Sequence, residues 1–307
     1  MIKNTGAFND EVDFNKIFKA IYQYKNFIFG LSSIFLLLGI VYSLFLPNIY
    51  QSRALLSPVN SQTNLQGSLR GYGGIASLAG INIPSSDVSN NSVQAIEKVK
   101  SLSFFKDNIM PNIYLPDLMA FKSWDPITKE VKYNSKDYDV KNKSWTRDIK
   151  KYGSSIPSAQ ESYEIFIDKH LNVVVDQEIG FIEILVNHQS PYISNEWTNL
   201  IVSEINSFYR QKDEIEAIST IDYLSKEILV TTVAEIRVMI SELIQKEMQK
   251  LSVIKVNNFY VYEFIDPPEV MEEKYKPSRV LISFIFMLFG CFLGIFISLV
   301  SNANKKD

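Results

Sequence analysis

Two uncharged apolar runs near opposite ends of the sequence constrain what this chain can fold into. The first spans residues 27–46 (FIFGLSSIFLLLGIVYSLFL) and the second spans residues 280–300 (VLISFIFMLFGCFLGIFISLV). An α-helix rises about 1.5 Å per residue, so about 20 apolar residues cross the ~30 Å hydrocarbon core of a bilayer. Backbone groups in lipid must bond to one another, which predicts that both runs are transmembrane helices.

Two crossings divide the chain into five segments. We expect an N-terminal segment at 1–26, membrane helices at 27–46 and 280–300, one extramembrane domain at 47–279, and a tail at 301–307. A cleaved signal peptide is the alternative for the first run, but its apolar core spans only about 7–15 residues before a small-residue cleavage site. The first run is longer than that and ends in Leu-Pro-Asn, so we interpret it as a retained helix.

The charges beside the first helix indicate its orientation. Lys16, Lys19 and Lys25 precede it, whereas only Arg53 follows it closely, which places both termini in the cytoplasm by the positive-inside rule. The domain then faces the periplasm of a bacterial inner membrane. The only cysteine, Cys291, lies in the second apolar run, so the domain contains no disulfide.

The pattern between the two runs predicts an α+β domain with a small mixed sheet. Residues 60–91 are glycine-rich but lack the Gly-Lys-Ser/Thr of a phosphate-binding loop, so we expect a plain loop. Residues 111–157 are expected to be irregular and aromatic. Helical spacing occurs at 92–109, and strand patterns occur at 48–59, 171–176, 180–187 and 256–265.

Residues 193–255 are predicted to form a long amphipathic helical region with one face buried. An unbroken helix of this length would run roughly 90 Å. The β-branched run at 230–233 and a capping-box pattern from Thr232 to Glu235 favour a hairpin of two helices that meet near Thr231, with a single helix as the alternative. The apolar positions are Ile201, Ile205, Phe208, Ile215, Ile218, Ile221, Leu224, Ile228, Val233, Ile236, Ile240, Leu243, Met248, Leu251 and Ile254.

Catalytic and metal-binding patterns are not found, so no catalytic, cofactor-binding or metal site is predicted. His170 and His188 lack the close spacing of paired metal ligands, and strand alternation is expected to scatter them and nearby acids over both sheet faces. The Asp213/Glu214 pair is expected to be solvated. Trp124 and Trp145 suit either sugar stacking or the anchoring of loops. The net charge of −3 argues against a nucleic-acid partner.

The approach to the second apolar run combines three features with physical roles. Prolines fix φ and remove backbone donors, which predicts a stiff, extended entry to the bilayer. Basic residues anchor such an entry at the interface, and paired glycines let another helix approach closely, here the first helix through Gly30 or Gly39. The predicted packing and juxtamembrane residues are Pro267, Pro268, Lys276, Pro277, Arg279, Gly290 and Gly294.

Seven segments, taken in order, resemble one protein family. They are EVDFNKIF at 11–18, LPNIYQSRALL at 46–56, VAEIR at 233–237, LIQKEM at 243–248, IDPP at 265–268, KPSR at 276–279 and GCFLG at 290–294. In this order and topology the chain is similar to the polysaccharide co-polymerases, the Wzz-type chain-length determinants of bacterial surface polysaccharides.

The resemblance implies a non-catalytic inner-membrane protein that sets the length of O-antigen or a related glycan. It further implies a ring-like homo-oligomer that acts with a Wzy-type polymerase on undecaprenyl-linked repeats. A kinase-bearing subfamily is not expected, because the sequence has no nucleotide loop after the second run. The alternatives are an export adaptor that couples an inner-membrane transporter to an outer-membrane channel, and a periplasmic glycan enzyme.

Overall fold

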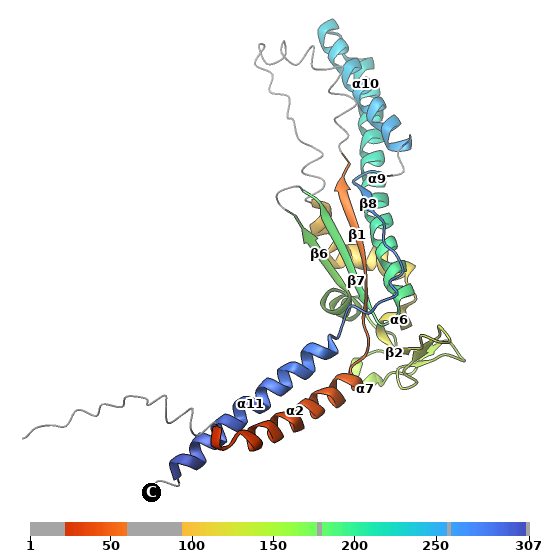
Figure 1. Cartoon of the computed structure of the whole chain (residues 1–307). Coiled ribbons are helices and arrows are strands. Elements are labelled where there is room, and N and C mark those ends of the chain that lie inside the picture. The colour runs from red at the N-terminus through yellow and green to blue at the C-terminus, as the bar shows by residue number, and fades with distance from the viewer. Residues whose placement is uncertain (1–21, 60–93, 177–179, 257–258, 305–307) are drawn as a thin grey trace, which may run out of the picture. The chain divides into compact units, whose positions relative to one another are not determined.

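The computed structural model describes residues 22–59, 94–176, 180–256 and 259–304 (Figure 1). The motif at 11–18, the glycine-rich residues 60–91 and the strand connection at 177–179 lie outside the described residues. The chain divides into two compact units, one of residues 1–48 with 274–307 and one of residues 49–273.

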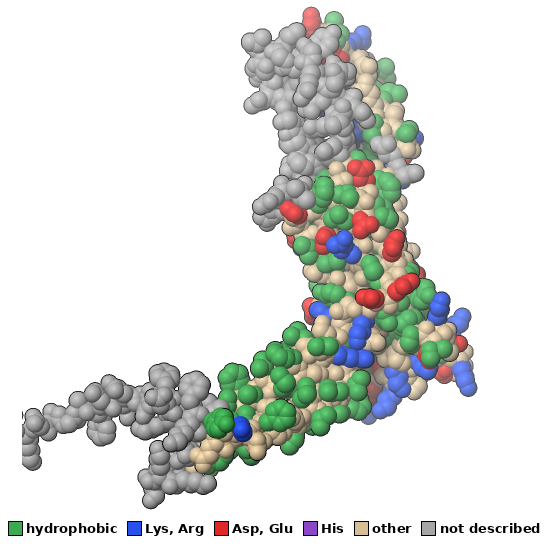
Figure 2. Space-filling view, viewed as in Figure 1, with side chains coloured by type: hydrophobic (Ala, Val, Ile, Leu, Met, Phe, Trp, Pro, Cys, Tyr) green, Lys and Arg blue, Asp and Glu red, His purple; other side chains and the backbone are tan. Residues whose placement is uncertain are grey.

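The first unit contains two apolar helices, α2 (Lys25–Phe45) and α11 (Arg279–Asn304). Both are long and apolar enough to cross a membrane, with mean hydropathies of 2.3 and 2.8. Hydrophobic side chains cover their outer surfaces (Figure 2). The helical structure predicted for both apolar runs is therefore confirmed.

The second unit is built on a four-stranded sheet with the order β6-β7-β1-β8. Every pair of neighbours is antiparallel, which corrects the mixed sheet expected from the sequence. β1 lies in the centre, and its alternate residues Tyr50, Ser52, Ala54 and Leu56 are buried. The strands are β1 (Tyr50–Pro58), β6 (Leu171–Val175), β7 (Ile182–His188) and β8 (Tyr262–Asp266).

Short helices and two small sheets complete this unit. The segment 111–157 was expected to be irregular, but it forms two two-stranded antiparallel sheets, β2-β3 and β4-β5. Residues 94–99 are helical. The remaining short elements are α5 (Leu102–Phe104), η1 (Phe105–Ile109), η2 (Met110–Asn112), α6 (Leu115–Met119), β2 (Phe121–Trp124), β3 (Val131–Tyr133), β4 (Tyr138–Asp139), β5 (Ser144–Trp145), α7 (Ile149–Tyr152), α8 (Ala159–Ile165) and η3 (Phe166–His170).

The long helix α9 (Pro191–Val230) covers the sheet with its first half. Pro191 at its start suits the first turn, where a missing N–H leaves no helical bond unmade. Trp197, Ile201 and Ile205 recur at helical spacing and are fully buried in the core with Leu56 and Ile184 of the sheet. The sequence pattern predicted this buried face correctly over the first half of the helix.

The second half of α9 pairs with α10 (Ala234–Val256) as a helical hairpin (Figure 1). α9 ends at Thr231, where the backbone becomes extended with a ψ of 123°, and both the N–H and the hydroxyl of Thr231 donate to the carbonyl of Glu227. The Nε of Arg237 then donates to the Thr231 carbonyl at 2.8 Å. The hairpin favoured by the sequence is therefore confirmed, and the single-helix alternative is excluded.

Asn206 on α9 joins this helix to β8. Its Oδ1 accepts hydrogen bonds from the backbone N–H groups of Tyr260, Val261 and Tyr262 at 2.8–3.1 Å. Its Nδ2 donates to the carbonyls of Val202 and Tyr262. A buried amide that uses both ends in this way supplies partners for backbone groups that water does not reach.

We predict that Asn206→Ala lowers the free energy of unfolding by about 2–4 kcal/mol, because buried backbone donors and a carbonyl lose their partner. Denaturant titration of the full chain in detergent measures this. Asn199→Ala is the matched control on the same helix, since Asn199 is exposed and, among the described residues, its side chain bonds to Asn195 alone. Equal midpoints for the two variants would show that Asn206 does not hold β8.

Candidate functional site

The seam between α2 and α11 contains the glycines singled out in the sequence. Gly290 lies against Phe35 and Ser32, and Gly294 lies against Ile28. Gly39 lies against Phe286 and Ser283 of α11. Residues later in α11 contact residues earlier in α2, so the two helices are antiparallel.

In the seam, a phenylalanine of each helix packs against a glycine of the other helix. A Cβ on Gly290 would lie 2.7 Å from the Cβ of Phe35, and one on Gly39 would lie 2.8 Å from the Cβ of Phe286. The backbone is also close, because the Cβ on Gly290 would be 3.0 Å from the Ser32 Cα. Any side chain at these positions therefore separates the helices. Gly30 has nothing within 4 Å, so Gly39 is the α2 glycine in this contact.

Aromatic rings and serines fill the rest of the seam. Phe35 packs edge-on to Phe289, and Tyr42 stacks on Phe286, each with 5.7 Å between ring centroids. The buried hydroxyls of Ser43, Ser283 and Ser298 donate to carbonyls three or four residues earlier in their own helix. No polar group of these serines is left unpaired in an apolar surrounding.

The predicted juxtamembrane residues divide between the two units. In the first unit, Arg279 Nη2 donates to Asn48 Oδ1 at 3.2 Å, Lys276 Nζ lies 5.0 Å from the Tyr275 ring centroid, and Pro277 is half-buried. In the second unit, Pro267 is exposed, whereas Pro268 is buried and its carbonyl accepts from Asn195.

We predict that Gly290→Ala destabilises the seam by about 1–3 kcal/mol, because the added methyl group overpacks against Phe35 and the α2 backbone. The melting temperature of the full chain in detergent measures this loss. Gly30→Ala is the matched control, since that position has open space. A melting temperature for Gly290→Ala equal to that of Gly30→Ala would contradict close packing of the two helices.

His170 and His188 form a buried pair, which sequence reasoning missed. The rings stack with centroids 5.4 Å apart, and Trp197 packs edge-on to both. His170 Nδ1 donates to the Asn187 carbonyl at 2.7 Å. His188 Nδ1 accepts from Ser190 N, and its Nε2 donates to the Asp117 carbonyl. The expected scatter over two faces is wrong, because His170 lies at the end of η3 and not within a strand.

Burial controls the titration of this cluster. Desolvation lowers the pKa of His170 to about 4, and desolvation with the neighbouring His170 lowers the pKa of His188 to about 3. Desolvation raises the pKa of the Asp117 carboxyl to about 6, although the Tyr133 hydroxyl donates to it at 2.6 Å. Within the described ranges there is no group of three or more His, Cys, Asp or Glu that could hold a metal ion.

We predict that the domain loses stability as the pH falls from about 6.5 toward 4. Both histidines are neutral in the folded state and take up protons on unfolding below pH 6.5, which favours the unfolded state. The Asp117 carboxyl takes up its proton in the folded state below about pH 6, which favours folding and offsets only part of the stability lost through the two histidines. His188→Asn keeps an acceptor for Ser190 N and removes one titrating ring. In denaturant titrations we expect the variant to have a lower free energy of unfolding at pH 7.5, and that free energy to change less between pH 6.5 and 4. An unchanged dependence on pH would contradict this account.

The hairpin surface differs from its sequence prediction. Ile215, Ile218, Leu243 and Met248 are exposed in the single chain, whereas Ile240 and Ile254 of the same predicted face are buried, so only part of that face is covered along the hairpin. Asp213, expected to be solvated, is buried and accepts a hydrogen bond from the Tyr260 hydroxyl at 2.6 Å. These two residues lie 47 positions apart, so the return of the chain from the hairpin to β8 brings them together.

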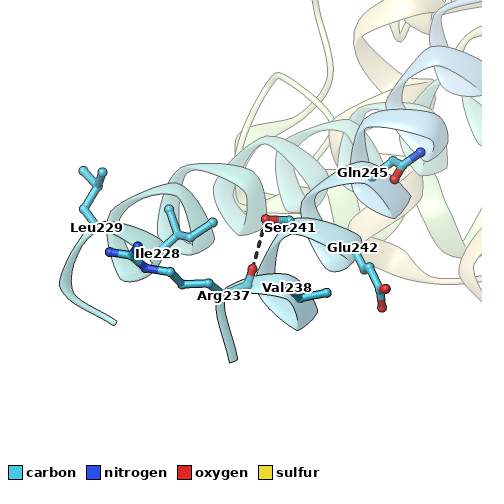
Figure 3. Close-up of a pocket in the computed structure, with 7 residues that line it drawn as sticks. All are labelled: Ile228, Leu229, Arg237, Val238, Ser241, Glu242 and Gln245. Atoms are coloured by element: carbon cyan, nitrogen blue, oxygen red, sulfur yellow. Dashed lines mark hydrogen bonds between the residues drawn. The ribbon is translucent and has the colours of Figure 1, made fainter. Parts of the chain in front are cut away.

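A cavity of about 560 Å³ lies at the turn of the hairpin (Figure 3). Arg237 points across the end of α9, and Ser241 donates to the Arg237 carbonyl. The lining is mixed apolar and polar, with no nucleophile and base in contact among its residues. They are Ile228, Leu229, Arg237, Val238, Ser241, Glu242 and Gln245.

The fold and seam define a class of protein, in which the chain encodes an α+β domain with a helical hairpin between two helices that are long and apolar enough to cross a bilayer. Residues 10–106 match the family model described as Wzz, chain length determinant protein. The resemblance to that family is therefore confirmed over this part of the chain, and the α+β fold class is confirmed by the structure.

Solved structures of two co-polymerases are similar to this chain. One is a full-length bacterial polysaccharide co-polymerase with 11% sequence identity. The alignment covers 97% of this chain and 99% of the co-polymerase chain, with a TM-score of 0.40. The other is a fragment of WzzB, a polysaccharide co-polymerase from Salmonella Typhimurium, with 11% sequence identity. The alignment covers 75% of this chain and 100% of the fragment, with a TM-score of 0.33. None of the curated proteins matches the sequence.

Proposed function

We propose that this chain is a non-catalytic co-polymerase that sets the length of a bacterial surface polysaccharide, O-antigen or a related glycan. The match of residues 10–106 to the chain length determinant family is the observation that carries this proposal. A Wzy-type polymerase acting on undecaprenyl-linked repeats is the proposed partner. The protein limits the polymerase and itself breaks or forms no glycosidic bond.

The proposed topology is that of a two-pass inner-membrane protein. Residues 27–46 and 280–300 cross the bilayer, the domain at 47–279 with its helical region at 193–255 lies in the periplasm, and residues 1–26 and 301–307 lie in the cytoplasm. The apolar outer surfaces of α2 and α11 and their close seam support two helices that cross as a pair. Lys276 and Arg279 are the proposed interfacial anchors.

Self-association is proposed to use the helical hairpin. Large apolar side chains that are 49–69% exposed lie on both of its helices, at Ile215, Ile218, Leu243 and Met248. A helix face of this kind gains stability when a second copy covers it, and symmetric copies generate a closed ring. This arrangement supports the ring-like homo-oligomer implied by the family.

We predict that loss of this gene leaves surface polymer present but broadens its length distribution. Gel ladders of the surface polysaccharide from deletion and complemented strains measure this, and the complemented strain should regain a narrow range of lengths. The polymerase should still add repeats, because the chain supplies no catalytic group to the reaction.

Two other ladder outcomes would contradict the co-polymerase. An unchanged ladder would show that the chain does not control length. Finished polymer retained inside the cell would instead indicate the export adaptor, since that function moves polymer without measuring it.

A further inference from the structure

A basic lobe stands on one side of the second unit. It comprises residues 121–150 with β2, β3, β4 and β5, and it contains five acidic residues. Figure 2 shows Lys and Arg side chains gathered over the part of the molecule that includes this lobe. Seven lysines of the lobe are exposed, namely Lys122, Lys129, Lys132, Lys136, Lys141, Lys143 and Lys150.

The turn between β2 and β3 presents an aliphatic side chain to solvent. Ile127 is 90% exposed, the highest value among the large apolar side chains described. The Asp125 carboxylate fixes this turn by accepting from the N–H groups of Ile127 and Thr128. Lys132 lies 3.8 Å from the same carboxylate, and the Lys129 side chain follows directly after the turn. The acid therefore shapes the turn while exposed lysines flank Ile127.

Aromatic rings lie beside this turn. Trp124 packs edge-on to Tyr50 at 5.5 Å and to Tyr192 at 6.3 Å between centroids. The Lys129 ammonium lies 5.6 Å from the Tyr192 ring centroid. Trp, Tyr and Lys beside an exposed aliphatic residue form the composition that proteins place at a membrane–water interface.

The covalent chain limits how far this turn lies from the bilayer. Tyr50 begins β1, and α2 ends at Phe45, so residues 46–49 join the apolar helix to the residue that Trp124 contacts. A fully extended chain spans about 3.3–3.6 Å per residue, which limits this link to about 18 Å. If α2 spans the bilayer, Trp124 and the turn are held within reach of the headgroup region.

We propose that the β2–β3 turn binds the membrane surface, with Ile127 entering the headgroup region and Lys122, Lys129 and Lys132 facing the phosphates of anionic phospholipids. This contact rests on the proposed membrane span of α2. It would fix the domain against the bilayer at a second point, beside the covalent links. Attraction of a basic residue to an anionic surface contributes about 1 kcal/mol, which is about fivefold in the contact equilibrium for each lysine.

A glycan is the competing occupant of the lobe. Sugars stack on aromatic faces and bond to polar groups, whereas an isolated aliphatic side chain offers them little. Exposed Ile127 between lysines fits the acyl and phosphate layers of a bilayer better, so the lipid surface is the occupant that the contacts favour.

A spin label on the full chain tests this contact. In a Cys291→Ser background, Ile127→Cys is labelled with a nitroxide and the chain is reconstituted in vesicles of phosphatidylcholine with or without phosphatidylglycerol. We expect oxygen accessibility to rise, and accessibility to a water-soluble nickel complex to fall, only with the anionic lipid. A label at Leu37→Cys in α2 reports the membrane span itself, so failure of the topology is distinguished from failure of the lobe contact.

Charge variants complete the test. Lys122→Gln with Lys129→Asn and Lys132→Gln should abolish the lipid-dependent change at residue 127, with asparagine chosen because Lys129 has a φ of 57°. Lys246→Gln with Lys250→Gln and Lys255→Gln on α10 removes the same charge elsewhere and should leave the change intact. The proposal is overturned if residue 127 stays in water in both lipid mixtures while residue 37 is in lipid, or if added surface polysaccharide alone changes the signal at 127.

Discussion

The packing of the first half of α9 on the antiparallel sheet is the interaction on which the rest of the domain depends. Trp197, Ile201 and Ile205 fill the core, and the same uninterrupted helix then continues beyond the sheet into the hairpin. A helix is stiff over this length, so the buried half fixes the direction of the exposed half. Asn206, at the border between the two halves, also fixes the strand to which α10 returns.

That division gives one helix two different surfaces. Hydrophobic burial stabilises the half that covers the sheet, whereas Ile215 and Ile218 beyond it remain exposed in the single chain. Exposed apolar faces on long helices favour association with another protein surface. The core residues thus secure the fold of the chain, and the proposed self-association would use the exposed side chains of the hairpin.

The sequence predicts those parts of the fold whose signal is local. The apolar helices follow from hydropathy alone, and the break at Thr231 follows from a β-branched run. The pairing of His170 with His188 does not follow, because it depends on where a helical turn meets a strand end. Asp213 is similar, since its charge predicted exposure and only the return of β8 brings Tyr260 to it. β2 to β5 escaped prediction because they are very short and bounded by side-chain turns.

The seam illustrates the same limit within the candidate site. Gly290 and Gly294 were identifiable from their spacing, but the choice of Gly39 over Gly30 depends on the antiparallel register of the two helices. Phe35 and Phe286 set that register, because each fits only opposite a glycine of the other helix. Each phenylalanine ring fills the space left by a glycine of the other helix. This register depends on both apolar runs and cannot be read from either one alone.

Two separate pairings of the same chain segments reinforce each other. α2 leads into β1 and β8 leads into α11; β1 pairs with β8 in the sheet, and α2 pairs with α11 in the seam. Ser52 extends the strand contact by donating to the Glu269 carbonyl beyond the end of β8. Once either pairing has formed, the loop that the other must close is short, so its entropic cost is lower. The antiparallel seam and the antiparallel β1–β8 pair therefore stabilise each other. Together they keep the segment that enters the domain, α2 to β1, beside the segment that leaves it, β8 to α11.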